Sequence, residues 1–280
     1  MEFPRTTIAG VSLSRLVIGS NWMSGFSHTS NAADCHILET FRETGSYTPV
    51  IGAFVKHGVN AIMGNYSGKS ENSKKLLKAE ENLGTKLVII DTPVINMDDN
   101  KEARDECRKI FRESAKLGAA FCLIHHASCE QLVNKNKKTI DRISDYLDMI
   151  RQEGLKPGLS AHMPEIIQYS DLNEYDVETY IQIFNCLGFL MQIEIESVIK
   201  IIHEAKKPVI TIKPMAAGRA SPYVGLTFNW TVIRPIDLVT VGCFTPMEVE
   251  EDIEISLAAL ERRLPNLQAR GSPARQSIIK

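Results

Sequence analysis

The sequence has 280 residues, with 32 Lys and Arg against 34 Asp and Glu, so its formal net charge is −2. This balance offers no strongly basic face and argues against a nucleic-acid-binding protein. Hydrophobic residues make up 44% and charged residues 24% of the chain, which excludes a disordered protein and is typical of a globular one. The length suits either two smaller domains or one α/β barrel of about 250 residues.

The first residues and the cysteines indicate a cytoplasmic protein. Residues 1–10 lack the apolar stretch of a signal peptide, and no window approaches the ~18 apolar residues of a membrane span. The six cysteines are scattered, with no Cys-x-x-Cys pair. We therefore expect reduced, buried thiols, a cytoplasmic location and no membrane partner.

In chain order, a hairpin over residues 7–14 is followed by eight short apolar runs. The runs span residues 16–20, 59–63, 86–91, 119–126, 156–162, 177–185, 208–214 and 237–242. Most of them are continuously apolar, as expected of parallel strands that are buried on both faces. The longest irregular stretch is expected over residues 23–46, after the first of these strands.

Amphipathic patterns between the runs predict helices. Apolar residues recur at spacings of three and four over residues 140–150, 195–202 and 249–260. Alternating strands and helices predict a parallel sheet, and eight such units favour a closed (β/α)8 TIM barrel. We predict a single barrel domain over residues 1–263, with the hairpin at its bottom, and a C-terminal tail over residues 264–280.

Polar side chains follow several predicted strands, at the end of the barrel where TIM barrels place their active sites. His125 and His162 follow neighbouring strands, and Asp91 ends the strand before them. Imidazole and carboxylate groups are common metal ligands, so these three residues are a candidate site for a divalent metal. Alternatively, the histidines bind substrate or form hydrogen bonds within the barrel mouth. Because side chains alternate along a strand, only one of His125 and His126 is expected to face the interior.

Lys213 and Tyr66 are the other catalytic candidates beside His125. A buried lysine can form a Schiff base or hold an anion as a point charge, whereas the alternative is a lysine that reaches solvent or pairs with Asp91. Tyr66 can act as a general acid or contact the substrate. Six further polar residues are expected to bind a small-molecule substrate, namely Asn21, Trp22, Ser160, Gln182, Asn185 and Arg219.

Over most of the chain, the order of the motifs resembles that of the aldo-keto reductases. The motifs are TTIAGVSLSRLVIGSNW at 6–22, HGVNAIMGNYSGKSE at 57–71, LIHH at 123–126, GLSAH at 158–162, YIQIFN at 180–185, KPMAAGR at 213–219 and VGCFTPMEVEEDI at 241–253. The resemblance implies a TIM barrel with an N-terminal hairpin and an NADP site at its mouth.

Carried over residue by residue, the resemblance implies an altered active site. The catalytic His corresponds to His125, but the catalytic Asp falls on Met63, and the catalytic Lys falls on Thr92, or on Asp91 with a one-residue slip. The catalytic Tyr corresponds to Tyr66 only if the loop is two residues shorter. A phenol has a reference pKa of ~10 and needs a nearby cation to act as an acid near neutral pH. The residues expected beside a nicotinamide fall on Ala161 and Ile212.

The leading hypothesis is a small-molecule enzyme that does not carry out standard NADP-dependent reduction. It would act as a lyase, isomerase or hydrolase on a carbonyl or sugar-like substrate, with the help of a divalent metal as one option. One alternative is a divergent NADP-dependent oxidoreductase, supported by His125, Tyr66, Gln182 and the motifs at 213–219 and 241–253. Another is a catalytically inactive barrel that acts as a binding protein. The substrate and the oligomeric state are left open.

Overall fold

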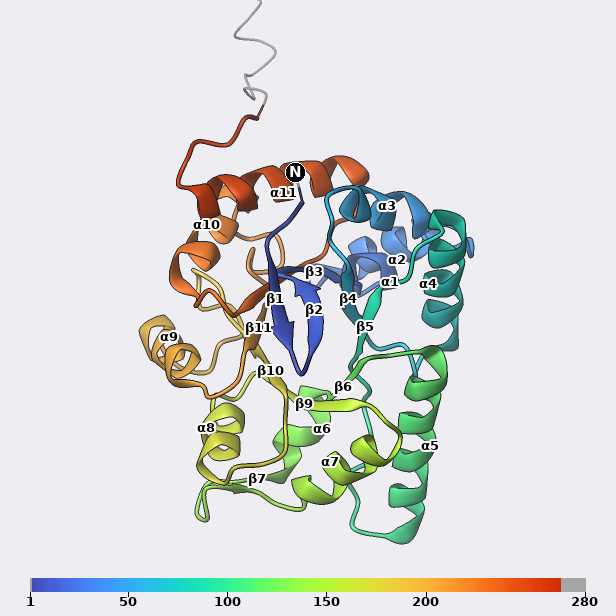
Figure 1. Ribbon diagram of the computed structural model, residues 1–280, viewed down its shortest axis with the longest axis vertical. Helices are drawn as coiled ribbons and strands as arrows, with labels where there is room; N and C mark the ends of the chain where they lie inside the picture. The colour runs from blue at the N-terminus through green and yellow to red at the C-terminus, as the bar shows by residue number, and fades with distance from the viewer. Residues whose placement is uncertain (1, 268–280) are drawn as a thin grey trace, which may run out of the picture.

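The computed structural model describes residues 2–267, and their central feature is a closed barrel of parallel strands (Figure 1). The strand order around the barrel is β10–β11–β12–β3–β4–β5–β6–β9. The strands are β3 (Leu16–Gly19), β4 (Ala61–Gly64), β5 (Val88–Asp91), β6 (Phe121–Ile124), β9 (Lys156–Ala161), β10 (Thr179–Ile183), β11 (Val209–Ile212) and β12 (Leu238–Val241). Each predicted apolar run overlaps one of these strands, and only β4 extends beyond its run, by one residue, so the predicted (β/α)8 barrel is confirmed.

An antiparallel hairpin, β1 (Arg5–Ile8) and β2 (Val11–Ser14), precedes the barrel and crosses its opening in Figure 1. Because β2 leads directly into β3, the hairpin lies at the N-terminal ends of the strands. Ile8 and Leu13 are buried there in the same hydrophobic cluster as Val17, which points into the barrel. The hairpin therefore closes the end of the barrel opposite the strand C-termini, as predicted.

Helices surround the barrel as an outer layer (Figure 1). The longer ones are α3 (Thr48–Lys56), α4 (Ser70–Leu83), α5 (Lys101–Leu117), α7 (Ile143–Gln152), α8 (Glu165–Leu172), α9 (Ile195–Glu204), α10 (Pro222–Val232) and α11 (Pro246–Glu261). The three predicted amphipathic patterns correspond to α7, α9 and α11. Two short helices, α1 (Asn21–Ser24) and α6 (His126–Cys129), begin just after β3 and β6, and a short hairpin of β7 (Val133–Asn134) and β8 (Thr139–Ile140) follows α6.

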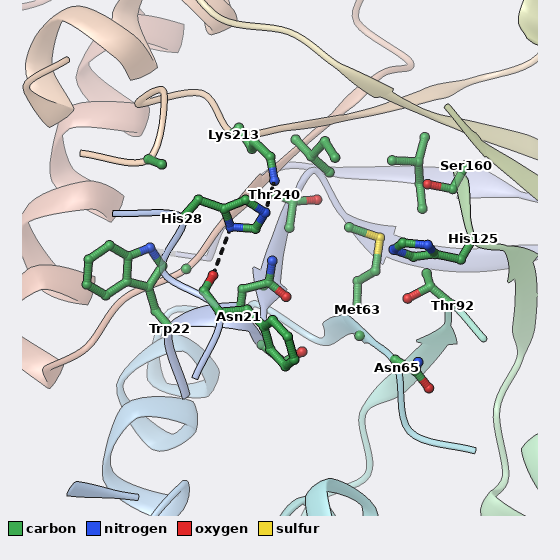
Figure 2. A pocket seen from close by; sticks show the side chains of 18 of the residues that line it. Asn21, Trp22, His28, Met63, Asn65, Thr92, His125, Ser160, Lys213 and Thr240 are labelled. Carbon is green, nitrogen blue, oxygen red and sulfur yellow. Dashed lines mark hydrogen bonds between the residues drawn. The ribbon is translucent and has the colours of Figure 1, made fainter. Parts of the chain in front are cut away.

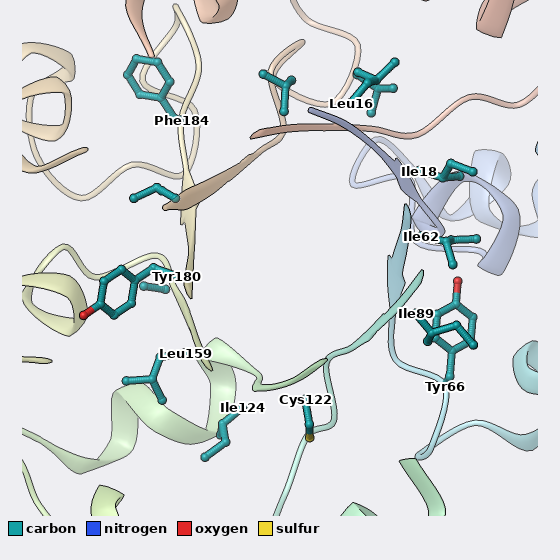
Figure 3. Packing of buried hydrophobic residues seen from close by; sticks show 14 of the residues in the cluster. Leu16, Ile18, Ile62, Tyr66, Ile89, Cys122, Ile124, Leu159, Tyr180 and Phe184 are labelled. Atoms are coloured by element: carbon teal, nitrogen blue, oxygen red, sulfur yellow. The ribbon is translucent and has the colours of Figure 1, made fainter. Parts of the chain in front are cut away.

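Successive residues of a barrel strand enter two different hydrophobic clusters. Leu16 and Ile18 of β3 face outward into the large cluster between the strands and the helices (Figure 3), whereas Val17 faces the barrel interior. Burial on both faces explains why the strands are continuously apolar in sequence. The same alternation decides which polar residues near the strand ends reach the barrel mouth.

The prediction that residues 23–46 form a long irregular stretch is wrong, because this segment contains the helix α2 (Asn31–Thr40). The Ser30 side chain caps this helix by accepting a hydrogen bond from the backbone N–H of Ala33 at 3.1 Å. Ile37 is the one α2 residue that is fully buried, so the helix carries little apolar periodicity. The predicted tail lies outside the described residues, apart from residues 264–267.

The six cysteines are free thiols, as expected. Four of them are buried, but Cys35 is exposed and Cys186 is half-buried, so uniform burial was a wrong prediction. In the part of the chain that the structure describes, no helix is both long and apolar enough to cross a membrane.

Candidate active site

A cavity of about 390 Å³ opens at the C-terminal ends of the barrel strands (Figure 2). Its basic side chains are Lys69, Lys213 and four histidines at positions 28, 125, 126 and 162. Among the described residues that line it, none is an aspartate or a glutamate. The cavity wall therefore combines groups that donate protons or carry positive charge, with no carboxylate to neutralise them.

His125 directly follows β6, and its ring points into the cavity beside Met63 (Figure 2). The backbone N–H of Ala127 donates a hydrogen bond to Nδ1 of His125 at 3.2 Å. Burial, followed by the neighbouring His126, lowers the pKa of His125 to about 4. The ring is therefore neutral near pH 7, and because Nδ1 accepts, its single proton lies on Nε2 at the tip of the ring.

His126 stacks between two other histidines of the cavity wall. Its ring centroid lies 3.8 Å from that of His162 and 4.3 Å from that of His125. The prediction that only one of His125 and His126 faces the interior is wrong, since both line the cavity. The physical reason is that β6 ends at Ile124 and α6 begins at His126, so strand alternation no longer applies.

Glu130 positions this histidine stack from behind. Its carboxylate accepts hydrogen bonds from the backbone N–H groups of His162 and Met163, and its other oxygen lies 3.8 Å from Nδ1 of His126. Burial raises the pKa of Glu130, but the nearby His126 ring and the hydrogen bonds from the two N–H groups outweigh it and lower the pKa overall. Burial, with the nearby His126 and Lys213, lowers the pKa of His162 to about 3.

Lys213 follows β11 and reaches toward His28 across the mouth of the cavity (Figure 2). Its Nζ lies 3.1 Å from Nε2 of His28, whose Nδ1 lies 2.9 Å from the carbonyl oxygen of Phe26. A carbonyl oxygen only accepts, so Nδ1 carries the proton of the neutral ring and Nε2 accepts from the lysine. Partial burial and the charge of Lys213 lower the pKa of His28, and burial lowers the pKa of Lys213 to about 8.

The segment 26–28 forms one side of the mouth and is contacted by three basic side chains. Nζ of Lys69 lies 3.7 Å from the centre of the Phe26 ring, a cation–π contact, while Lys213 contacts the ring of His28. Arg219 donates to the carbonyl oxygens of His28 and Ala216, at 3.5 and 3.2 Å. Arg219 was predicted to bind substrate, but it is not part of the cavity wall. Its guanidinium group instead contacts the backbone of the segment 26–28.

Tyr66 does not line the cavity, although it was predicted to be catalytic. Its ring is 1% exposed and packs outside the barrel in the cluster that contains Ile62 and Ile89 (Figure 3). Burial raises the pKa of its phenol far above 10, which removes any role as a general acid near neutral pH. The predicted catalytic role of Tyr66 is therefore corrected to one in packing.

Gln182 and Asn185 also lie outside the cavity wall, against the prediction that they bind substrate. Ile181 lines the cavity, so strand alternation turns Gln182 outward, where its amide donates to the carbonyl oxygen of Ile183 at 3.2 Å. Asn185 accepts from the backbone N–H groups of Leu187 and Phe189 at 3.2 and 2.9 Å. Both residues shape the β10 end of the barrel from outside the cavity.

The structure does not assemble the predicted metal site. Asp91 is fully buried and accepts the backbone N–H of Tyr66 at 2.8 Å, because it faces outward from β5 while Ile90 faces inward. His125 and His162 do line the cavity. Within residues 2–267, no group of three or more His, Cys, Asp or Glu side chains is arranged to hold a metal ion. The proposed ligand set of His125, His162 and Asp91 is corrected accordingly.

Of the predicted site residues, the structure brings together Asn21, Trp22, His125, Ser160, His162 and Lys213 in the cavity wall. It adds His28 and Lys69, which the sequence did not identify as site residues. His28 lies in the long segment after the first strand, a place where TIM barrels carry functional loops, and this was the signal available for it. For Lys69 we find no comparable signal.

Comparison with known proteins gives similarities in structure alone. No family model matches the sequence, and no curated protein matches it. A candidate aldo-keto reductase from Pseudomonas aeruginosa has a TM-score of 0.65 at 16% identity, over 91% of this chain and 95% of that one. An aldo-keto reductase from Klebsiella pneumoniae, solved with NADP and acetate, has a TM-score of 0.56 at 14% identity, over 96% and 98% of the two chains.

The N-acetylmannosamine-6-phosphate 2-epimerase from Clostridium perfringens is also similar, with a TM-score of 0.51 at 14% identity over 85% and 91% of the two chains. The barrel with its N-terminal hairpin and these neighbours decide the fold. The chain is an aldo-keto reductase-like TIM barrel. At the positions that the sequence resemblance assigns to catalytic residues, this aldo-keto reductase-like barrel has Met63, Thr92 and His125, and all three line the cavity.

The resemblance implies a cofactor phosphate at the start of α11. In this aldo-keto reductase-like barrel, the side chain of Glu248 occupies that place. The carboxylate of Glu248 accepts the backbone N–H groups of Phe244 and Thr245 at 2.6 and 3.2 Å. The Thr245 hydroxyl in turn accepts the N–H of Glu248, which completes a capping box. A phosphate would have to displace this carboxylate, so the residues at this site do not fit an NADP phosphate.

Proposed function

We propose that this protein is an enzyme that binds a small anionic carbonyl compound and transfers a proton at the carbon next to the carbonyl group. The reaction class would be an isomerisation or a lyase reaction. One observation carries the proposal: the same cavity wall holds a neutral imidazole donor, Nε2–H of His125, a buried amine, that of Lys213, and Nε2 of His28, which carries no proton and can accept one from the substrate carbon.

A neutral imidazole suits the stabilisation of a developing enolate. Proton loss next to a carbonyl group moves negative charge onto the carbonyl oxygen, and a fixed donor aimed at that oxygen lowers the barrier. Because Nδ1 of His125 is held by the N–H of Ala127, the donor Nε2–H does not depend on pH above about 5. Such a group acts as an electrophile rather than as a base.

The charge of the cavity wall supports an anionic substrate. Lys69 and Lys213 line the wall without any lining carboxylate, and burial alone lowers the pKa of each, with no carboxylate partner among the described residues opposing it. A cleft lined by one sign of charge raises the local concentration of ligands of the opposite sign. Small 2-keto acids and phosphorylated sugars combine the required negative charge with a carbonyl group.

The NADP-dependent alternative has weaker support. The similar structures include both aldo-keto reductases and an epimerase, so the fold alone does not choose between hydride transfer and proton transfer. The residues favour proton transfer, because Glu248 holds the N–H groups at the start of α11 and Tyr66 lies outside the cavity. A titration of NADPH fluorescence with the protein tests this alternative, since saturable binding would favour a reductase.

The test of the proposal is exchange with solvent deuterium, followed by proton NMR. Pyruvate, 2-oxobutyrate, glyceraldehyde 3-phosphate and ribose 5-phosphate are incubated with the protein in D2O at pH 7. We expect loss of the proton signal next to the carbonyl group for at least one compound, and loss of this exchange in the His125→Ala variant. The matched control is His36→Ala, because His36 is exposed on α2 and is not part of the cavity wall.

A further inference from the structure

We propose that Lys213 forms a covalent imine with the carbonyl carbon of the substrate, and that His28 takes the proton that the amine must lose first. This inference rests on the proposed function, since it requires a substrate with a carbonyl group. It goes further by naming the nucleophile, its base and the covalent intermediate.

The geometry of the pair carries the inference. Nε2 of His28 is the unprotonated nitrogen of its ring, because Nδ1 donates to the carbonyl oxygen of Phe26, and it lies 3.1 Å from Nζ of Lys213. A proton can pass directly between these two atoms at that distance. The two residues come from loops after different strands, β3 and β11, so the contact depends on the barrel fold.

The backbone also indicates that this contact is built into the fold. Lys213 and His28 both have φ of 59°, a left-handed conformation that residues with a side chain rarely adopt. Ala216 and Ala217, in the turn after Lys213, share this conformation with φ of 50° and 54°. Such strain persists where surrounding contacts enforce it, and it is concentrated at functional sites. Arg219 supplies one such contact by donating to the carbonyl oxygen of His28.

The surroundings favour the unprotonated amine. Lys213 has no carboxylate partner among the cavity-lining residues, and its Nζ lies 3.1 Å from Nε2 of His28. Burial lowers the pKa of Lys213 from 10.5 to about 8. At pH 7, this change gives about 300-fold more unprotonated amine than at an exposed lysine. A lysine activated in this way is a suitable nucleophile for a carbonyl carbon.

The chemistry balances without an oxidant or a further reactant. The ammonium group of Lys213 passes one proton to Nε2 of His28, and the free amine then forms a bond to the carbonyl carbon. Nε2–H of His125 holds the carbonyl oxygen, which then leaves as water. The water takes two of the three protons of the original ammonium group. His28 returns one of these two protons, and the amine nitrogen supplies the other. The products are a protonated imine and one water, and the positive imine makes the neighbouring C–H more acidic. Nε2 of His28, again without a proton, can accept the proton from that carbon. In this route His125 assists the loss of water, whereas it holds an enolate oxygen only if no imine forms.

Reductive trapping tests the inference in the wild-type protein. Pyruvate is the probe, because it is the simplest carbonyl compound with a negative charge, and sodium cyanoborohydride reduces any imine to a stable amine. Mass spectrometry of the intact protein and of its peptides then locates the adduct. We expect one adduct on Lys213, formed about 300-fold faster than on an exposed lysine at pH 7. Equal labelling of Lys213 and the exposed lysines would overturn the inference.

Three variants separate the roles. Lys213→Arg keeps the positive charge but cannot form an imine, so the fast adduct should disappear. His28→Gln removes the proton acceptor and should slow trapping at least about tenfold at pH 7, with recovery as the pH rises above 8. Lys200→Arg is the control, because Lys200 is 74% exposed on α9, and it should trap pyruvate as the wild type does.

The outcomes distinguish this inference from the proposed function. If deuterium exchange persists in Lys213→Arg while no imine is trapped in the wild type, the enzyme transfers protons without a covalent lysine and the inference is wrong. If Lys213 traps pyruvate but no carbonyl compound exchanges its proton, the inference stands and the proposed proton transfer is wrong.

Discussion

The backbone N–H of Ala127 donates to Nδ1 of His125 at 3.2 Å and thereby places the proton of the neutral ring on Nε2. The short helix α6 makes this contact, because it begins one residue after His125 and turns the N–H of Ala127 back toward the ring. The protonation of His125 is therefore a consequence of local backbone geometry, and burial keeps the ring neutral.

The pKa of His125 should be measurable directly. Burial, followed by the charge of His126 and of Lys213, lowers it from 6.5 to about 4. A nitrogen-15 NMR titration should show a neutral ring protonated on Nε2 from pH 8 down to about pH 5. Titration near pH 6.5, or a proton on Nδ1, would show that Nε2–H is not the donor at neutral pH.

Glu130→Gln should destabilise the fold at pH 7, by about 1–2 kcal/mol, because the charged acceptor of two backbone N–H groups becomes a neutral one. The pKa of Glu130 is lowered on folding, so its contribution is present above its usual pKa of 4.5 and is lost as the pH falls further. Urea unfolding at pH 7 and pH 4 checks this. A difference between the variant and wild type that is the same at both pH values would contradict it.

Asp252→Asn should stabilise the protein at neutral pH. Burial raises the pKa of Asp252 from 3.8 to about 7, while a contact at 3.4 Å with the thiol of Cys243 opposes this change. A carboxyl group with a raised pKa stabilises the fold when protonated. Its contribution is full below pH 3.8 and is lost as the pH rises to 7, by at most about 1.4 kcal/mol per pH unit.

Thermal or urea unfolding of Asp252→Asn and the wild type, at pH 4 and pH 8, measures this effect. The variant should gain stability relative to the wild type as the pH rises between these values. An equal stability difference at both pH values would show that Asp252 keeps an ordinary pKa in the folded protein.

Gly158→Ala should destabilise the barrel by about 2 kcal/mol or more, as overpacking of a core does. A Cβ at Gly158 would lie 2.6 Å from the backbone oxygen of Thr179 on the neighbouring strand, which cannot move aside. The control is Gly45→Ala, whose Cβ would meet no atom closer than the Asn82 side chain at 3.7 Å. Comparable unfolding midpoints for the two variants would contradict the tight approach of β9 to β10.

The barrel could be predicted from the sequence because each strand is a mostly continuous apolar run, as in parallel strands buried on both faces, and eight such units favour a closed barrel over an open sheet. The site was predicted less well, because it depends on which way single side chains point. Gln182 and Asp91 turn outward since Ile181 and Ile90 point inward, and this depends on the register of each strand.

Two other features of the site had no readable signal in the sequence. His126 reaches the cavity because β6 ends at Ile124, and apolar patterns do not fix the last residue of a strand. The contact between His28 and Lys213 depends on left-handed backbone at both residues, and nothing in the residue types predicts this conformation for a histidine or a lysine.

The most direct test of the central claim is the initial rate of deuterium exchange next to the carbonyl group at pH 7, compared among the wild type, His125→Ala and His36→Ala. Loss of a fixed donor to an enolate oxygen should lower the rate by about 100–1,000-fold in His125→Ala, while His36→Ala should exchange as the wild type does. Exchange of at least one anionic carbonyl compound with this dependence on His125 is the predicted result. The account would be contradicted if the wild type exchanges none of the compounds, or if His125→Ala exchanges them at the wild-type rate.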